Sequence, residues 1–238
     1  YVVEVMNHWL SRGIDGWRLD AAYAPGAAAW RPILERVKRE HPEAWILAEL
    51  IHGDYSGFVT ESGVDSVTQY ELWHAIWDSL ADRNFFSLQW TLGRHRTFCE
   101  TYRPQTFISN HDVTRIASKL NDPRDVEIAA TLLMLLPGIP SIYAGDEQGF
   151  TGVKEDHAYG DDAVRPPFPD TPEGLFPYGA ELHAHYRAMI SLRRQHPWLV
   201  DAELATSQLT NTWITITLTG PDAELTLDLN IDDETVDD

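Results

Sequence analysis

The sequence has few of the groups that would tie it to a disulfide, a nucleic acid or a membrane. Its single cysteine, Cys99, excludes an internal disulfide and a thiolate metal site. Lysine and arginine number 18 against 37 aspartates and glutamates, which gives a net charge of −19 and argues against nucleic acid or anionic lipid as a partner. The longest apolar run, residues 128–136, is about half the ~20 residues that a membrane helix needs. We therefore expect no nucleic acid and no membrane partner.

Motifs for dinucleotides, nucleotide phosphates and zinc proteases are also absent. Neither G-x-G-x-x-G nor G-x-x-x-x-G-K-[ST] occurs, and none of the ten histidines forms an H-E-x-x-H motif. Apolar residues, in contrast, make up 43% of the chain, with nine Trp, nine Tyr and eight Phe. This composition is typical of a folded globular protein. At 238 residues it corresponds to about one and a half domains of ~150 residues each.

The distribution of charged residues changes near residue 200. Residues 201–238 contain ten acidic and no basic side chains, whereas all 18 lysines and arginines precede them. We therefore predict one domain over 1–199 and the beginning of a second over 200–238.

Short apolar strands alternate with amphipathic helices through most of the chain. Such alternation predicts a parallel sheet with helical crossovers, either doubly wound or closed into a barrel. A loop rich in Pro and Gly follows over 145–179, and two segments of period two then predict β-strands of the second domain. The expected strands are 14–19, 44–47, 64–68, 106–109, 139–143, 212–219 and 224–231, and the expected helices are 2–10, 30–37, 72–80, 88–99, 126–136 and 182–194.

Three of the predicted strands end in an acid, namely Asp20, Glu49 and Asp112. A single acid at a strand end is usually a helix cap or a solvated loop residue. In a parallel barrel, however, all carboxyl ends of the strands open onto one face, where barrel enzymes place their chemistry. We therefore expect the side chains of the three acids to lie close together. They would form a carboxylate site that either acts on carbohydrate or binds a metal ion.

Paired carboxylates suit glycoside hydrolysis, in which one attacks the anomeric carbon and the other protonates the leaving oxygen. Arg18 precedes Asp20 by two residues, so both side chains point to the same side of the strand, and the guanidinium would keep Asp20 ionised as the nucleophile. Glu49 has no basic neighbour in the sequence nearer than His52. Glu49 is therefore the better candidate for the general acid and base.

Three segments resemble signature segments of the alpha-amylase family, glycoside hydrolase family 13. They are GIDGWRLDAA, ILAEL and FISNHD, and PGIPSIYAGDEQG resembles the family's eighth strand and its following loop. The resemblance covers about residues 1–197. It implies an α/β fold, a (β/α)8 TIM barrel of which only about strands 4 to 8 are present, followed by the start of a C-terminal all-β domain, a β-sandwich.

The resemblance also assigns roles to five residues. Asp20 resembles the family's nucleophile, Glu49 its acid/base, and Asp112 the third acid, which binds sugar hydroxyls. Arg18 resembles the arginine beside the nucleophile, and His111 the histidine that donates to substrate hydroxyls. The resemblance thus implies catalytic roles for three acids and substrate-binding roles for Arg18 and His111.

The chain departs from the family pattern in two places. The family's first signature, Asp-x-x-x-Asn-His, occurs nowhere in the sequence. Many α-amylases carry Lys-His three and four residues after the nucleophile, where this chain has Tyr23 and Ala24. The second departure disfavours an endo-acting starch amylase. Exo-acting α-glucosidases, maltooligosaccharide-forming enzymes and transglycosylases remain open.

The resulting prediction is a retaining α-glycoside hydrolase that acts on α-linked gluco-oligosaccharides or α-glucans through a covalent glycosyl-enzyme. The alternatives are a transglycosylase or isomerase of the same family, or a non-catalytic carbohydrate-binding or scaffolding barrel. We expect an oligosaccharide or polysaccharide as the partner and identify no cofactor and no metal site. Calcium is possible, but its usual ligands lie in the family's preceding barrel strands. We expect residues 1–238 alone to be inactive, because part of a barrel leaves free sheet edges and an unfinished cleft.

Overall fold

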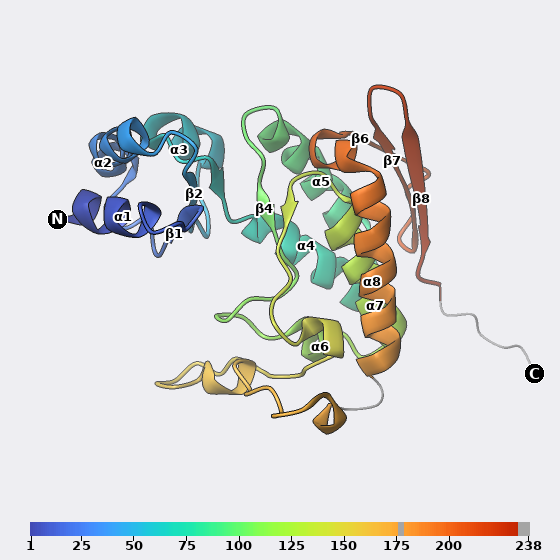
Figure 1. Cartoon of the computed structure of the whole chain (residues 1–238). Coiled ribbons are helices and arrows are strands. Elements are labelled where there is room, and N and C mark those ends of the chain that lie inside the picture. Colours follow the sequence, from blue (N-terminus) through green and yellow to red (C-terminus); the bar gives the residue numbers. More distant parts are fainter. Residues whose placement is uncertain (176–178, 233–238) are drawn as a thin grey trace, which may run out of the picture.

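The computed structural model describes residues 1–175 and 179–232 and is built around five parallel strands. Strand β1 (Gly16–Leu19) pairs with β2 (Trp45–Ala48), and β2 pairs with β3 (Ser66–Val67). A single bridge, Thr68 to Gln105, joins β3 to β4 (Gln105–Thr106), which pairs with β5 (Ile139–Pro140). The strands therefore follow one another in space in the order of the chain, as in a barrel (Figure 1). The outer edges of β1 and β5 have no partner among the described strands.

Helices occupy the connections between the strands. The first has apolar residues on one face, buries Val3, Met6 and Leu10, and ends at Leu10. A turn follows in which Gly13 adopts a φ of 100°, which glycine tolerates best. No helix in the described part of the chain is long and apolar enough to cross a membrane. The helices are α1 (Val2–Leu10), α2 (Ala27–Glu40), α3 (Tyr55–Ser62), α4 (Tyr70–Ala81), α5 (Phe86–Cys99), α6 (Ile116–Lys119), α7 (Pro123–Leu135) and α8 (Gly179–Gln195), and single 3-10 turns cover Asp146–Gln148, Asp162–Val164, Pro172–Gly174 and Pro197–Asp201.

The structure confirms the expected helices and strands to within a few residues and adds elements that the sequence patterns did not predict. Helix α3 is too short for a clear apolar period, although Asp54 accepts a hydrogen bond from Gly57 as its N-cap. The strand expected over 106–109 is wrong beyond Thr106, because residues 107–109 leave the ladder. The helix α6 was also missed. Residues 176–178 of the expected loop lie outside the described residues.

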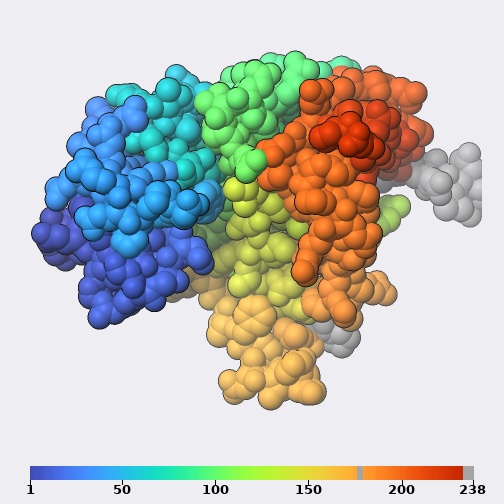
Figure 2. Space-filling model, turned by 45° about the horizontal axis from the view of Figure 1, so that its top comes forward, coloured from blue at the N-terminus to red at the C-terminus, as the bar shows by residue number. Residues whose placement is uncertain are grey.

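The C-terminal residues form a small antiparallel sheet of three strands. Strand β7 (Trp213–Thr219) pairs with β6 (Glu203–Ser207) on one side and with β8 (Glu224–Asn230) on the other. The prediction of two strands missed β6, which has only two half-buried or buried positions. The buried face of the sheet joins the same hydrophobic core as α4, α5, α7 and α8, and Figure 2 shows these C-terminal residues against the middle of the chain. The domain boundary near residue 200 stays a prediction.

A buried ion pair ties the segment after β5 to the segment after β4. The Nη1 of Arg115 lies 2.9 Å from Oδ1 of Asp146, and both side chains are at most 2% exposed. The same guanidinium donates to the carbonyls of Ala144 and Val164, both at 3.0 Å, and lies over the ring of Tyr143. Burial raises the pKa of Asp146 to about 7 against the opposing effect of Arg115. The path of residues 143–165 therefore depends on Arg115.

We expect Asp146→Ala to lower the free energy of unfolding by about 3–5 kcal/mol, because it leaves a buried guanidinium that cannot lose its proton without a partner. Urea denaturation measures this change. Asp201→Ala is the matched control, since the Asp201–Arg103 pair is more than half exposed and should contribute about 1 kcal/mol or less. Equal losses in the two variants would contradict this reasoning.

A histidine of α5, His95, is fully buried. Its Nε2 lies 3.0 Å from the carbonyl oxygen of Pro137. Its Nδ1 lies 3.4 Å from the side-chain nitrogen of Gln69, and Cys99 contacts its Nε2. Burial lowers the pKa of His95 to about 4, so the fold holds the neutral imidazole.

Because the folded-state pKa of His95 lies below its unfolded value of 6.5, its contribution to stability is present above pH 6.5 and is lost as the pH falls toward 4. We expect this group to remove about 2 kcal/mol of unfolding free energy between pH 7 and pH 5. Urea denaturation at both pH values, compared with His95→Gln, isolates the effect. The proposal fails if the variant loses as much stability as the parent over this range.

Candidate active site

The register of β1 and β2 places two of the predicted acids beside each other. Leu19 pairs with Ala48 at the ends of the strands, and the backbone N–H of Glu49 donates to the carbonyl of Leu19 at 2.9 Å. Asp20 and Glu49 are therefore the next residues on two hydrogen-bonded neighbours. Their side chains leave the carboxyl edge of the sheet together.

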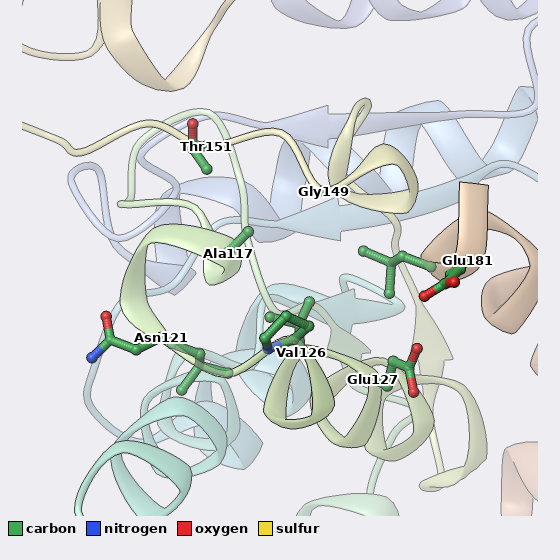
Figure 3. A pocket seen from close by; sticks show the side chains of 10 residues that line it. Ala117, Asn121, Val126, Glu127, Gly149, Thr151 and Glu181 are labelled. Atoms are coloured by element: carbon green, nitrogen blue, oxygen red, sulfur yellow. The ribbon is translucent and has the colours of Figure 1, made fainter. Parts of the chain in front are cut away.

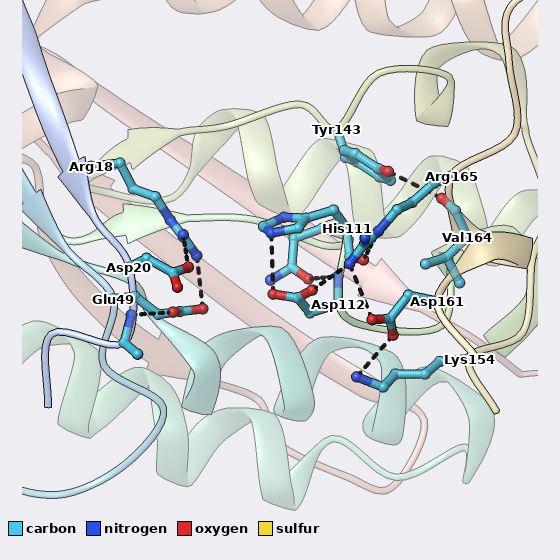
Figure 4. A network of polar contacts seen from close by, with 12 residues as sticks. Arg18, Asp20, Glu49, His111, Asp112, Tyr143, Lys154, Asp161, Val164 and Arg165 are labelled. Atoms are coloured by element: carbon cyan, nitrogen blue, oxygen red, sulfur yellow. Dashed lines mark hydrogen bonds and ion pairs between the residues drawn. The ribbon is translucent and has the colours of Figure 1, made fainter. Parts of the chain in front are cut away.

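One guanidinium contacts both of these carboxylates. Arg18 donates from Nη1 to Oδ1 of Asp20, and its Nη2 lies 2.8 Å from Oε1 of Glu49 (Figure 4). The backbone N–H of Ala21 donates to Oε2 of Glu49 at 2.8 Å. Ala21 has a φ of 43°, a conformation that a residue with a Cβ rarely adopts and that often marks functional sites. The chain thus turns sharply after Asp20, and this turn orients a donor toward Glu49.

The two carboxylates differ in their contact with solvent. The Asp20 side chain is 77% exposed, whereas that of Glu49 is 7% exposed. The sequence prediction that Arg18 lies beside Asp20 is confirmed. The argument that Glu49 lacks a basic neighbour is wrong, because Arg18 contacts it from the adjacent strand. Neighbours in the sequence do not show this contact, which the sheet register creates.

Tyr70 links this pair to the third acid. It is the first residue of α4 and is buried, and its hydroxyl donates to Oε1 of Glu49 at 3.4 Å while it accepts from Nδ2 of Asn110 at 2.9 Å. Burial raises the pKa of Tyr70 to about 12, so the hydroxyl keeps the proton that it donates.

Asp112 lies in the loop after β4, and not at the end of a strand as expected. The side chain of Asn110 accepts a hydrogen bond from the backbone N–H of Asp112 at 2.8 Å, a local turn that turns the backbone away from the ladder. His111 contacts Asp112, with Nε2 3.2 Å from Oδ2. A continuous series of side-chain and backbone contacts therefore joins Asp20, Glu49 and Asp112, through Arg18, Tyr70 and Asn110.

A second arginine holds Asp112 from the opposite side. Nη2 of Arg165 lies 2.9 Å from Oδ1 of Asp112 and 3.1 Å from Oδ2 of Asp161, and its Nε donates to the carbonyl of His111. Lys154 pairs with the other oxygen of Asp161. Arg165 follows Val164, whose carbonyl binds Arg115, so the buried ion pair described above fixes the place from which Arg165 reaches the site. Arg165 was not predicted from the sequence, since its loop has no regular period.

A cavity of about 270 Å³ is lined by residues of β1, β2 and β4 and of the segments that follow β3, β4 and β5. Arg18, Tyr70, Asn110 and His111 contribute to its wall. A larger cavity of about 470 Å³ lies elsewhere, between α6, α7 and the start of α8 (Figure 3), and contains none of the predicted site residues. The smaller cavity is therefore the candidate binding cleft.

The described residues contain no group of three or more His, Cys, Asp or Glu side chains that could hold a metal ion. The three acids of the site are instead paired with arginine. We therefore assign no ligands to the calcium ion that the family resemblance makes possible, and calcium stays an expectation.

Comparison with known proteins identifies the family to which the chain is related. Residues 1–170 match the family model of the alpha amylase catalytic domain. The chain is 30% identical to neopullulanase 2 of Thermoactinomyces vulgaris over 203 residues. This alignment covers 82% of the chain and 34% of the relative. It is 29% identical over 208 residues to maltogenic alpha-amylase of Bacillus acidopullulyticus, covering 84% of the chain and 34% of the relative.

Solved structures agree in fold. The alpha-amylase from H. orenii superimposes with a TM-score of 0.82 at 20% identity, over 96% of this chain and 53% of that one. A cyclic alpha-maltosyl-(1→6)-maltose hydrolase from Arthrobacter globiformis gives 0.82 at 23% identity, over 96% and 51%. The chain spans about a third of the length of these curated relatives and about half of these solved chains. The match over residues 1–170 shows that the chain belongs to the alpha-amylase family, glycoside hydrolase family 13.

Proposed function

We propose that this chain carries the catalytic carboxylates of a retaining glycoside hydrolase that acts on α-linked gluco-oligosaccharides or α-glucans. The observation that carries the proposal is the continuous series of contacts from Asp20 through Glu49 to Asp112. The names of its relatives support the substrate class, since they include a cyclomaltodextrinase, a neopullulanase and a maltogenic alpha-amylase. Solved neighbours include complexes with maltose and acarbose.

In this proposal Asp20 attacks the anomeric carbon while Glu49 donates its proton to the leaving oxygen. A covalent glycosyl-enzyme forms on Asp20, and Glu49 then takes a proton from the water that hydrolyses it. The high exposure of Asp20 leaves its carboxylate open to a sugar ring. Because Arg18 contacts both acids, the assignment of Glu49 as acid/base rests on its motif and on its burial beside the nucleophile, and not on a lack of charged neighbours.

Asp112 and His111 are proposed to bind sugar hydroxyls. His111 lines the cleft and contacts Asp112, which Arg165 restrains from the other side. Hydrogen bonds of this kind strengthen as the sugar ring distorts toward the transition state. Arg165 is therefore a positioning residue for Asp112 in this scheme.

In the complete protein, Asp20→Asn, Glu49→Gln and Asp112→Asn should each abolish most turnover of maltooligosaccharides. For Glu49→Gln the loss should be about 10²–10⁴-fold, the usual contribution of a general acid or base. Hydrolysis rates together with circular dichroism, which reports folding, provide the measurement.

Asp15→Asn is the matched control for these variants. Asp15 lies in the same segment as Asp20, is exposed, and makes no side-chain hydrogen bond or ion pair with the described residues. The Asp15→Asn variant should hydrolyse maltooligosaccharides at the rate of the parent protein. Turnover near the parent's in any of the three site variants would remove the role assigned to that residue.

A transglycosylase remains the second candidate, because the relatives also include a 4-alpha-glucanotransferase of Thermotoga neapolitana, 29% identical over 162 residues. A hydrolase should release shorter sugars from maltoheptaose, and NMR should detect the α-anomer first, as retention requires. Elongated or isomerised products would favour the transferase or isomerase. First appearance of the β-anomer would contradict the retaining mechanism for both.

A non-catalytic binding barrel is the third candidate. Such a protein has no need of an acid pair beside an arginine, and this chain keeps all three acids, linked through Arg18, Tyr70 and Asn110. The enzyme is therefore the better-supported proposal.

A further inference from the structure

Helix α5 presents two aromatic side chains to solvent on its outer face. Trp90 is 64% exposed and Phe86 is 51% exposed. They lie four residues apart in one helix and so occupy one face, about 6 Å apart along the axis. Their neighbours on the inner face, Leu88 and Leu92, are fully buried. The exposed rings are therefore not part of the core that holds the helix.

The indole of Trp90 is held from one side. The guanidinium of Arg94 lies over its ring, 5.3 Å from the centroid, and over Phe98 at 5.2 Å. Arg94 is itself fixed by two hydrogen bonds to Glu71, at 2.6 and 2.8 Å. Cation–π contact and bidentate pairing together restrict the ring at little entropic cost. Trp90 is thus exposed and yet restrained, as a binding platform requires.

Gly93 keeps the space beyond Trp90 open. A Cβ at this position would meet no atom within 4 Å, and the residue has ordinary helical backbone, so neither packing nor conformation requires glycine. Glycine within a helix costs about 1 kcal/mol relative to alanine. Side chains in a helix lean toward its N-terminus, so any longer residue at position 93 would lean over Trp90. The glycine leaves that side of the ring accessible.

We propose that Phe86 and Trp90 form a second carbohydrate-binding surface, separate from the carboxylate cleft, which takes a segment of an α-glucan chain. The apolar faces of sugar rings stack on such aromatic rings, and hydroxyls at the rim find donors in the polar side chains around them. Arg94 can supply one, since its Nη1 makes no hydrogen bond with the described residues. A neutral polyol also meets no repulsion from a chain of charge −19. The inference rests on the proposed substrate class.

A protein partner fits this surface less well. Phe86 and Trp90 are the only large apolar side chains exposed on α4 and α5, whose residues are all described. Two rings that could each bury about 150–250 Å² fall short of the roughly 1,000 Å² of a specific protein interface. The surface matches a narrow chain of sugar rings better than a broad interface.

The platform is also connected to the active site. Glu71, which holds Arg94, directly follows Tyr70, whose hydroxyl contacts Glu49. The part of α5 that carries Arg94 therefore packs against the end of α4 that contributes to the site. A polymer held on Trp90 would be retained near the cleft.

The test uses the complete protein carrying Asp20→Asn, which blocks hydrolysis, and measures retention by soluble starch in affinity electrophoresis. Trp90→Ala should weaken binding about fivefold, the range of one aromatic stacking contact. Gly93→Gln should weaken it too, although it removes no ring and favours the helix, so a loss there cannot reflect misfolding. Trp9→Ala is the control, since Trp9 is 48% exposed beside Arg12 but has no aromatic residue one turn before it.

Unchanged starch retention in both Trp90→Ala and Gly93→Gln would overturn the inference. So would a change of oligomeric state in Trp90→Ala by sedimentation velocity, which would identify a protein interface. The parent protein's turnover of maltoheptaose is measured separately. Its absence would count against the proposed function, whereas starch retention that depends on Trp90 would still support the surface.

Discussion

Two acids on neighbouring strands share one guanidinium, and the arrangement of the site depends on this contact. Parallel pairing brings Asp20 and Glu49 to adjacent strand ends, where two negative charges would repel each other. The positive charge of Arg18 contacts both carboxylates and offsets their repulsion. The backbone N–H of Ala21 donates a further hydrogen bond to Glu49. Asp20 follows Arg18 by two positions, so both side chains point to the same side of the extended chain. Strand periodicity places Arg18 beside Asp20, and strand pairing places it beside Glu49, so one guanidinium can contact both carboxylates.

The sequence predicted the parts of this molecule that are governed by local periodicity. Helices such as α1, with its apolar face and a glycine soon after its end, follow directly from spacing, and the three acids were found because each ends or follows an apolar strand. The contacts between strands were not predictable. Arg18 reaches Glu49 through sheet register, and Tyr70 reaches it from the start of a helix. Arg165 comes from an irregular loop 53 residues beyond Asp112, where no period exists to predict its direction.

The helical hairpin of α4 and α5 serves two surfaces. Its start contributes Tyr70 to the acid site, its interior contributes Leu88 and Leu92 to the core, and its outer face carries Trp90. One ion pair, Glu71 with Arg94, crosses the hairpin between these surfaces. Packing, site geometry and the proposed glucan platform thus depend on the same two helices.

The buried pair of Arg115 and Asp146 has a consequence for behaviour on heating. Hydration of charged groups becomes less favourable as temperature rises, so the cost of keeping two charges out of water falls. Apolar burial gains no comparable advantage. The desolvation cost that opposes the anchor leading from Asp146 to Arg165 therefore falls on heating, and the segment that restrains Asp112 is held by a contact whose cost decreases with temperature.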